Sequence, residues 1–108
     1  MKNRILPSLL AFGLCLSVAG VAHAAGDPVA GKKKNSMCAG CHGIPGWRTA
    51  YPEVYSVPKL GGQHADYIVD ALKDYKAGSR NHATMKAIVT SLSDQDMEDL
   101  AAYYSGGQ

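Results

Sequence analysis

The 108-residue chain has few of the side chains that usually fill a protein core. Its only phenylalanine is Phe12, and residues 25–108 contain just twelve Val, Ile and Leu side chains. That share, roughly one residue in seven, lies below the level at which a globular core becomes doubtful. Because a small domain also buries proportionally little surface, we expect disulfides, a metal, a cofactor or a partner to supplement the core.

The sequence also has no large excess of either charge. Eleven Lys and Arg stand against nine Asp and Glu, and two of the cations, Lys2 and Arg4, lie at the extreme N-terminus. The balance of the remaining residues excludes a polybasic nucleic-acid-binding protein. The length excludes a two-domain enzyme, and the low net charge together with periodic apolar segments argues against disorder.

Residues 1–24 have the pattern of a cleaved secretory signal peptide. Lys2 and Arg4 precede an uncharged stretch, residues 5–21, and Ala22-His23-Ala24 supplies a small-x-small cleavage site. This pattern favours a signal peptide over an uncleaved membrane anchor. We therefore expect residues 25–108 to form the mature domain, exported to the periplasm and without a membrane span.

The chain lacks a second cysteine pair. Cys15 lies in the leader, which leaves Cys38 and Cys41, and His42 follows at once. A zinc site needs four ligands, and a redox dithiol expects a strand–helix context that is absent nearby. C-x-x-C-H is instead typical of covalent haem attachment, because thiols nearly one helical turn apart can bond both vinyl groups on one porphyrin edge. We predict one haem c, held by Cys38 and Cys41 as thioethers, with His42 as an axial iron ligand.

Capping residues and apolar spacing predict four helices. Asp27-Pro28 begins the first helix, Gly78 ends the second, and Ser93 with Asp96 forms a capping box for the last. The expected helices cover about 28–39, 64–77, 85–91 and 94–104. A stripe on the last helix should be buried: Met97, Leu100, Ala101 and Tyr104. Residues 43–62, rich in proline, glycine and aromatics, predict a loop around the cofactor.

The second iron ligand has five candidates: Met37, Met85, Met97, His64 and His82. Met37 is tied to the side of the attached cysteines, Met97 belongs to the core stripe, and a surface position is expected for His64. Met85 follows a loop that can fold its thioether over the iron, so we predict Met85, with His82 as the alternative. A thioether ligand favours ferrous iron and would fill the sixth position.

The chain resembles the class I c-type cytochromes, near the small bacterial c-553 type and the single-haem halves of cytochrome c4. The resemblance covers nearly all of residues 25–108 and is carried by four segments: Cys38–His42, Pro58–His64, Arg80–Met85 and Leu92–Tyr104. It implies the all-α small class I fold, with helices wrapped around one covalently attached haem and the first and last helices packed across each other. It also implies His42 and Met85 as axial ligands.

The resemblance also implies roles for residues around the haem. The carbonyl of Pro58 would accept a hydrogen bond from the proximal histidine, and Leu60 would pack on the haem. Gln63 and Arg80 are candidate contacts of the haem propionates. The stretch 44–57 is longer than in the shortest relatives, and three aromatic residues there are candidates for a propionate contact or for ordinary packing: Trp47, Tyr51 and Tyr55.

We therefore expect a monomeric electron carrier that is not an enzyme and binds no nucleic acid. Its partners would be periplasmic or membrane-bound redox proteins, a donor reductase or dehydrogenase and an acceptor oxidase or reductase. The alternatives are a haem-bearing subunit or sensor module of a larger redox complex, or a gas- or peroxide-reactive haem protein. The cationic run Lys32–Lys34 is either the solvated face of the first helix or a site that steers an acidic partner.

Overall fold

The computed structural model describes residues 26–50 and 54–107, and within them the secondary structure is helical apart from one isolated bridge. The helices are α1 (Pro28–Lys34), α2 (Ser36–His42), α3 (Ala65–Ala77), α4 (Ala83–Val89) and α5 (Asp94–Ser105). The expected leader, residues 1–24, lies outside the described residues. No helix of the described part is long and apolar enough to cross a membrane.

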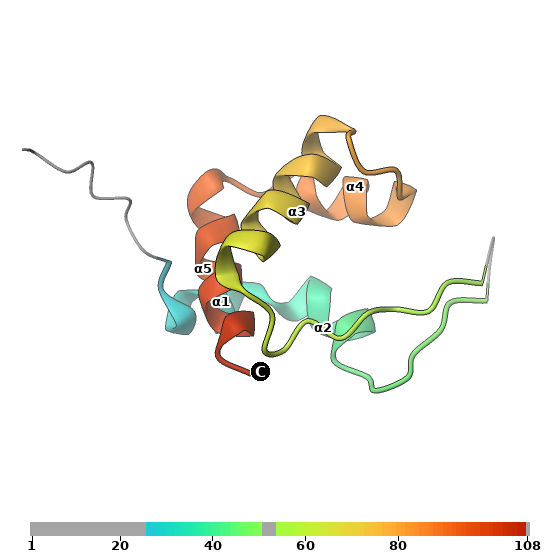
Figure 1. The fold of residues 1–108 in the computed structure, drawn as a ribbon, viewed down its shortest axis with the longest axis horizontal. Coiled ribbons are helices and arrows are strands. Elements are labelled where there is room, and N and C mark those ends of the chain that lie inside the picture. The colour runs from blue at the N-terminus through green and yellow to red at the C-terminus, as the bar shows by residue number, and fades with distance from the viewer. Residues whose placement is uncertain (1–25, 51–53, 108) are drawn as a thin grey trace, which may run out of the picture.

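The first expected helix is divided into two. Asp27 caps α1, and its carboxylate accepts a hydrogen bond from the Val29 N–H at 2.9 Å. At Asn35, where φ is −81° and ψ is 1°, the helix breaks, and the Asn35 carbonyl accepts the N–H groups of Cys38 and Ala39 as α2 begins. The break lets α1 pack against α5 while α2 carries the cysteine–histidine motif elsewhere (Figure 1).

Helix α3 ends where the sequence predicted. Gly78 adopts φ of 90°, the left-handed conformation that glycine tolerates, and its N–H donates to the Asp74 carbonyl at 3.0 Å. Ile68 and Val69 of this helix are buried, whereas Tyr67 is half exposed.

Helix α4 begins two residues earlier than expected, because His82 serves as its N-terminal cap. It also ends two residues earlier than expected, at Val89. For α5 the prediction is confirmed. The Ser93 hydroxyl accepts the Asp96 N–H at 3.1 Å, and the Asp96 carboxylate accepts the Ser93 N–H at 2.9 Å. This pair satisfies two backbone donors at the start of the helix.

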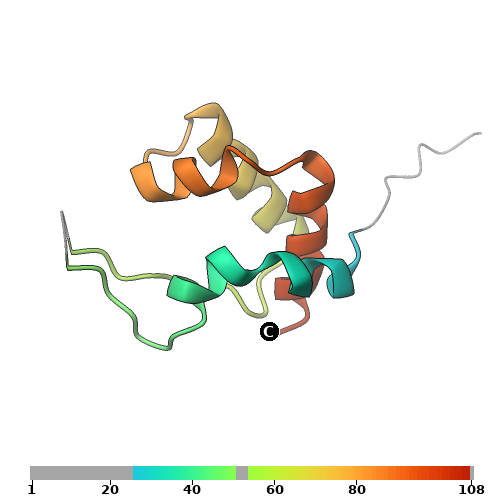
Figure 2. The ribbon, with the colours of Figure 1, turned by 180° about the vertical axis from the view of Figure 1, so that it is seen from behind.

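The core lies along α5, against which α1 and α3 pack (Figure 2). The stripe expected on α5 is confirmed, since Met97, Leu100, Ala101 and Tyr104 are all buried. Ile68 and Val69 of α3 complete the main cluster with three of these side chains. Few aliphatic side chains are involved, as the composition indicated.

A buried carboxylate joins α1 to α5. Asp99 is 3% exposed, and its carboxylate accepts three hydrogen bonds, from the Asp27 N–H, the Lys34 ammonium and the Gln95 amide, at 2.8, 2.6 and 2.9 Å. Lys34 also pairs with Asp96 at 2.7 Å. Lys34 therefore does not belong with the exposed Lys32 and Lys33 as one free cationic run.

Residues 43–50 and 54–58 form a narrow arm that leaves the helices and returns (Figure 1). Its two sides are joined by a bridge between Arg48 and Ser56, with Thr49 N–H donating to the Tyr55 carbonyl at 2.9 Å. A second bond of 2.9 Å links Val57 N–H to the Trp47 carbonyl. The described part of this segment contains no helix, as its proline and glycine content predicted.

Candidate functional site

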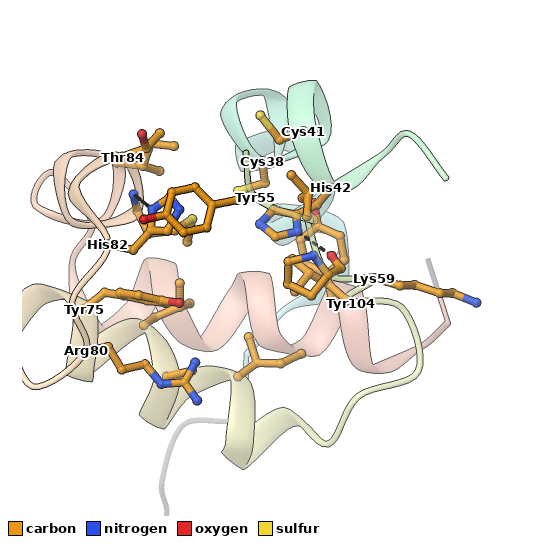
Figure 3. Close-up of a pocket in the computed structure, with 18 of the residues that line it drawn as sticks. Cys38, Cys41, His42, Tyr55, Lys59, Tyr75, Arg80, His82, Thr84 and Tyr104 are labelled. Carbon is orange, nitrogen blue, oxygen red and sulfur yellow. Dashed lines mark hydrogen bonds between the residues drawn. The ribbon is translucent and has the colours of Figure 1, made fainter. Parts of the chain in front are cut away.

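A cavity of about 580 Å³ opens between α2, α3, α4 and the returning side of the arm (Figure 3). Its volume falls in the range of small-molecule and cofactor pockets. Apolar side chains form much of the wall, among them Leu60, Ile68, Ala71, Leu72, Ile88 and Leu100. The helices therefore surround a cavity, in keeping with the small number of aliphatic side chains available to fill a core.

The cysteine–histidine motif forms one wall of this cavity. Cys38, Cys41 and His42 all line it, and both cysteines are free thiols. Two residues three apart on a helix share a face, which explains why both sulfur atoms meet the same space. Burial raises the pKa of the Cys38 thiol.

The imidazole of His42 is oriented by the chain after the arm. Its Nδ1 lies 2.7 Å from the carbonyl oxygen of Pro58. A carbonyl oxygen can only accept, so Nδ1 must carry the proton, and in the neutral ring Nε2 keeps its lone pair. The structure thus contains the contact that the resemblance implied for Pro58.

Met85, in the first turn of α4, also lines the cavity and is partly buried. Of the other methionines, Met37 lines the cavity but is 61% exposed beside Cys38, and Met97 is fully buried in the core and lies outside the lining. His82 lines the cavity with Met85. Figure 3 places the α2 residues on one side and the start of α4 on the other.

The two candidate propionate contacts, Gln63 and Arg80, both reach the cavity, but each also bonds to a neighbouring residue. Gln63 and Arg80 line the cavity, and the Gln63 side-chain oxygen accepts the His64 N–H at 2.9 Å. Arg80 donates to the Tyr67 hydroxyl at 2.7 Å, and its guanidinium lies 5.5 and 5.4 Å from the ring centres of Tyr67 and Tyr75. These contacts hold the cation at the cavity wall.

The aromatic candidates of the arm behave differently from one another. Tyr55 lines the cavity, Trp47 is 41% exposed and does not line it, and Tyr51 lies outside the described residues.

Tyr104 is a cavity residue that the sequence assigned only to the core. Its hydroxyl is buried and lacks a well-directed hydrogen bond among the described residues. Burial and the neighbouring Cys38 raise the pKa of Tyr104 to about 12, so the phenol is neutral at ordinary pH. Nothing in the helical spacing distinguishes such a tyrosine from one that merely packs, and no sequence signal could have found it.

Comparison with known proteins identifies the family. A family model described as cytochrome c matches residues 28–106. This chain belongs to the cytochrome c family. Cytochrome c4 of Pseudomonas aeruginosa is 43% identical over 103 residues, covering 95% of this chain and 48% of that protein. Cytochrome c-554(548) of Halomonas halodenitrificans is 43% identical over 84 residues, covering 75% of this chain and 96% of that protein.

The fold is similar to a solved member of the family. The crystal structure of reduced recombinant cytochrome c4 from Pseudomonas stutzeri matches with a TM-score of 0.56 and 28% identity. The match covers 78% of this chain and 51% of that one. The chain therefore has the class I cytochrome c fold and spans about half the length of the cytochrome c4 relatives.

Membership of the cytochrome c family implies a covalently bound haem c, and the side chains of the cavity fit that group. Two free thiols stand one helical turn apart beside an imidazole whose Nε2 is available, and a thioether lines the same apolar space. Within residues 26–50 and 54–107, no three His, Cys, Asp or Glu side chains are grouped to hold a bare metal ion. The donor set fits haem and not zinc.

Proposed function

We propose that this cytochrome c is a monohaem protein that carries single electrons between redox partners in the periplasm. One observation carries the proposal: the thiols of Cys38 and Cys41, the imidazole of His42 and the thioether of Met85 all line one cavity. They come from α2 and α4, whose residues face the cavity from different sides (Figure 3).

Each residue has a defined task in this proposal. Cys38 and Cys41 would hold the haem as thioethers, and His42 and Met85 would occupy its two axial positions. A bound haem supplies a one-electron Fe(III)/Fe(II) couple whose potential is raised by a thioether ligand. The Pro58 carbonyl fixes the plane and the tautomer of the His42 ring, as outer hydrogen bonds of metal-bound histidines commonly do.

The walls of the cavity would complete the haem environment. Leu60 and the apolar residues of α3 and α4 would exclude water from the haem, and Gln63 and Arg80, which also line the cavity, would contact its propionates. Arg80 is the better supported of the two, because its two tyrosine neighbours fix a permanent cation there.

Because both axial positions would be filled by side chains, we propose electron transfer and no catalysis. The proposed periplasmic location depends on export of the chain by the signal peptide expected at residues 1–24. The expected partners are a donor reductase or dehydrogenase and an acceptor oxidase or reductase. Contacts with such partners should be small and transient, as is usual for redox proteins. A monomer is proposed.

The experiment compares two methionine variants of the haem-loaded protein. Met85→Leu should abolish the weak Fe(III)–Met charge-transfer band and lower the reduction potential, because the thioether ligand is removed. Met37→Leu is the matched control, since Met37 also lines the cavity, and it should keep both properties. A pyridine haemochrome assay should give one haem per chain, and a redox titration should follow a one-electron curve.

Two results would contradict the proposal. If Met85→Leu keeps the charge-transfer band, Met85 is not the axial ligand. If the untreated ferrous protein binds carbon monoxide readily, the sixth position is open, and a gas- or peroxide-reactive protein becomes the better description. Stable co-purification with other redox proteins under mild conditions would favour a subunit of a larger complex.

A further inference from the structure

The N-terminus of α4 is capped by an unusual residue. His82 has extended backbone angles, φ −154° and ψ 109°, and its Nδ1 accepts the backbone N–H of Met85 at 3.2 Å. N-terminal caps are most often Ser, Thr, Asp or Asn, whose short side chains reach the same donor. Here the capped residue is itself the proposed axial ligand.

Two further elements hold the His82 ring. The ring centre lies 4.8 Å from that of Tyr55 in the arm, with the planes tilted by 58°. Tyr75 of α3 lies 6.5 Å away at 78°, in an edge-on arrangement. Both distances fall within the range of favourable aromatic contacts. Figure 3 shows Tyr55 and Tyr75 on the cavity side of α4 near His82.

The cap and iron binding by His82 exclude each other. A neutral imidazole that accepts at Nδ1 carries its proton on Nε2, which then has no lone pair for a metal. If Nε2 bound iron instead, the proton would sit on Nδ1 and face the N–H of Met85, donor against donor. The observed hydrogen bond therefore argues against the alternative ligand considered from the sequence.

We infer that His82 is a positioning residue for Met85: it fixes the first turn of α4, and so the backbone from which the thioether projects. The inference rests on the proposed function, because it concerns the proposed axial ligand. The proposed role of His82 also gives a function to the arm, because Tyr55 of the arm contacts the ring of His82, which holds the first turn of α4 in place.

The test uses the haem-loaded protein and three variants. His82→Ala removes the cap, and His82→Asn supplies a common capping side chain in its place. His64→Ala is the matched control, because His64 occupies the same position at α3 but its side chain makes no cap hydrogen bond. The readouts are hydrogen–deuterium exchange of the Met85 amide, the Fe(III)–Met charge-transfer band, and the affinity of ferric protein for added imidazole.

In His82→Ala, exchange of the Met85 amide should be about fivefold faster, the factor expected from loss of one helix cap. Imidazole should bind more tightly by up to the same factor, since Met85 is held less firmly and competes less well. His82→Asn should stay close to the parent protein in all three readouts, and so should His64→Ala.

A measurement on the unaltered protein serves if His82→Ala does not fold. Nitrogen NMR should show the His82 imidazole protonated at Nε2 and accepting at Nδ1, and the opposite tautomer would overturn the inference. The inference also fails if His82→Ala matches His64→Ala in amide exchange and imidazole affinity while the Fe(III)–Met band persists. Failure of the proposed function looks different, because there the band survives Met85→Leu.

Discussion

Replacing Gly31 by alanine should push apart α1 and α5, the first and last helices of the described residues. Gly31 is buried in α1 where it crosses α5. A Cβ atom at this position would lie 2.0 Å from the Asp99 carbonyl oxygen and 2.8 Å from the Tyr103 Cβ. To restore ordinary contact at 3.4 Å, the backbones would have to move apart by about 1.4 Å.

The size of the effect follows from two opposing contributions. Overpacking costs about 1–3 kcal/mol, and the upper end applies because the obstruction is α5 backbone, which cannot rotate away. Alanine regains about 1 kcal/mol of helix propensity over glycine. The free energy of unfolding should therefore fall by about 2 kcal/mol, which lowers the thermal midpoint by roughly 8–16 °C in a domain of this size.

Thermal unfolding of the haem-loaded protein, followed by far-ultraviolet circular dichroism, measures this change. Gly40→Ala is the matched control: Gly40 is also inside a helix, but a Cβ there meets nothing within 4 Å. It should stabilise the protein by about 0.5–1 kcal/mol. If Gly31→Ala proves as stable as Gly40→Ala, the close crossing of α1 and α5 does not constrain the fold and the reasoning is wrong.

Two further predictions concern α5. Hydrogen bonds from Lys34 lower the pKa values of Asp96 and Asp99 to about 2, so the stability that these carboxylates provide is present above about pH 4 and is lost as the pH falls towards 2. Guanidinium unfolding of Lys34→Gln should show a deficit against the parent at about pH 6 that shrinks near pH 2; a constant deficit would refute the assignment. Ser93→Ala should cost about 1 kcal/mol by loss of the capping box, whereas Ser36→Ala, at a helix start without a side-chain cap bond, should have little effect in the same assay. Equal changes in the two variants would mean that the capping box does not stabilise α5.

Features with local causes could be predicted from the sequence. Ser93 and Asp96 form the capping box as their spacing indicated, and Gly78 ends α3 in the left-handed conformation that it was expected to adopt. The buried stripe of α5 follows directly from helical periodicity. The haem-binding motif could also be predicted because it is local: its two thiols and its imidazole lie within five consecutive residues, Cys38–His42.

Features set by distant parts of the chain could not be predicted. The break at Asn35 arises because α1 packs on α5 while α2 lines the cavity, and no residue near Asn35 signals that division. Lys34 was interpreted with its cationic neighbours, whereas its carboxylate partners lie more than sixty residues away on α5. The start of α4 was placed too late because histidine is an uncommon cap, and the buried hydroxyl of Tyr104 has no counterpart in any sequence pattern.

The pairing of α1 with α5 has a consequence for the order of folding. Asp27 and Asp99, which bond to each other, are 72 residues apart, so this contact closes almost the whole domain into one loop. Contacts of such long sequence separation slow folding, because loop entropy must be lost before they form. Because the chain is made from the N-terminus, α1 cannot pack on α5 until nearly all of the chain exists. For a long part of folding, α1 and α5 have therefore not yet packed together. During that time the thiols of Cys38 and Cys41, on the helix that follows α1, remain accessible to solvent and to other reactants.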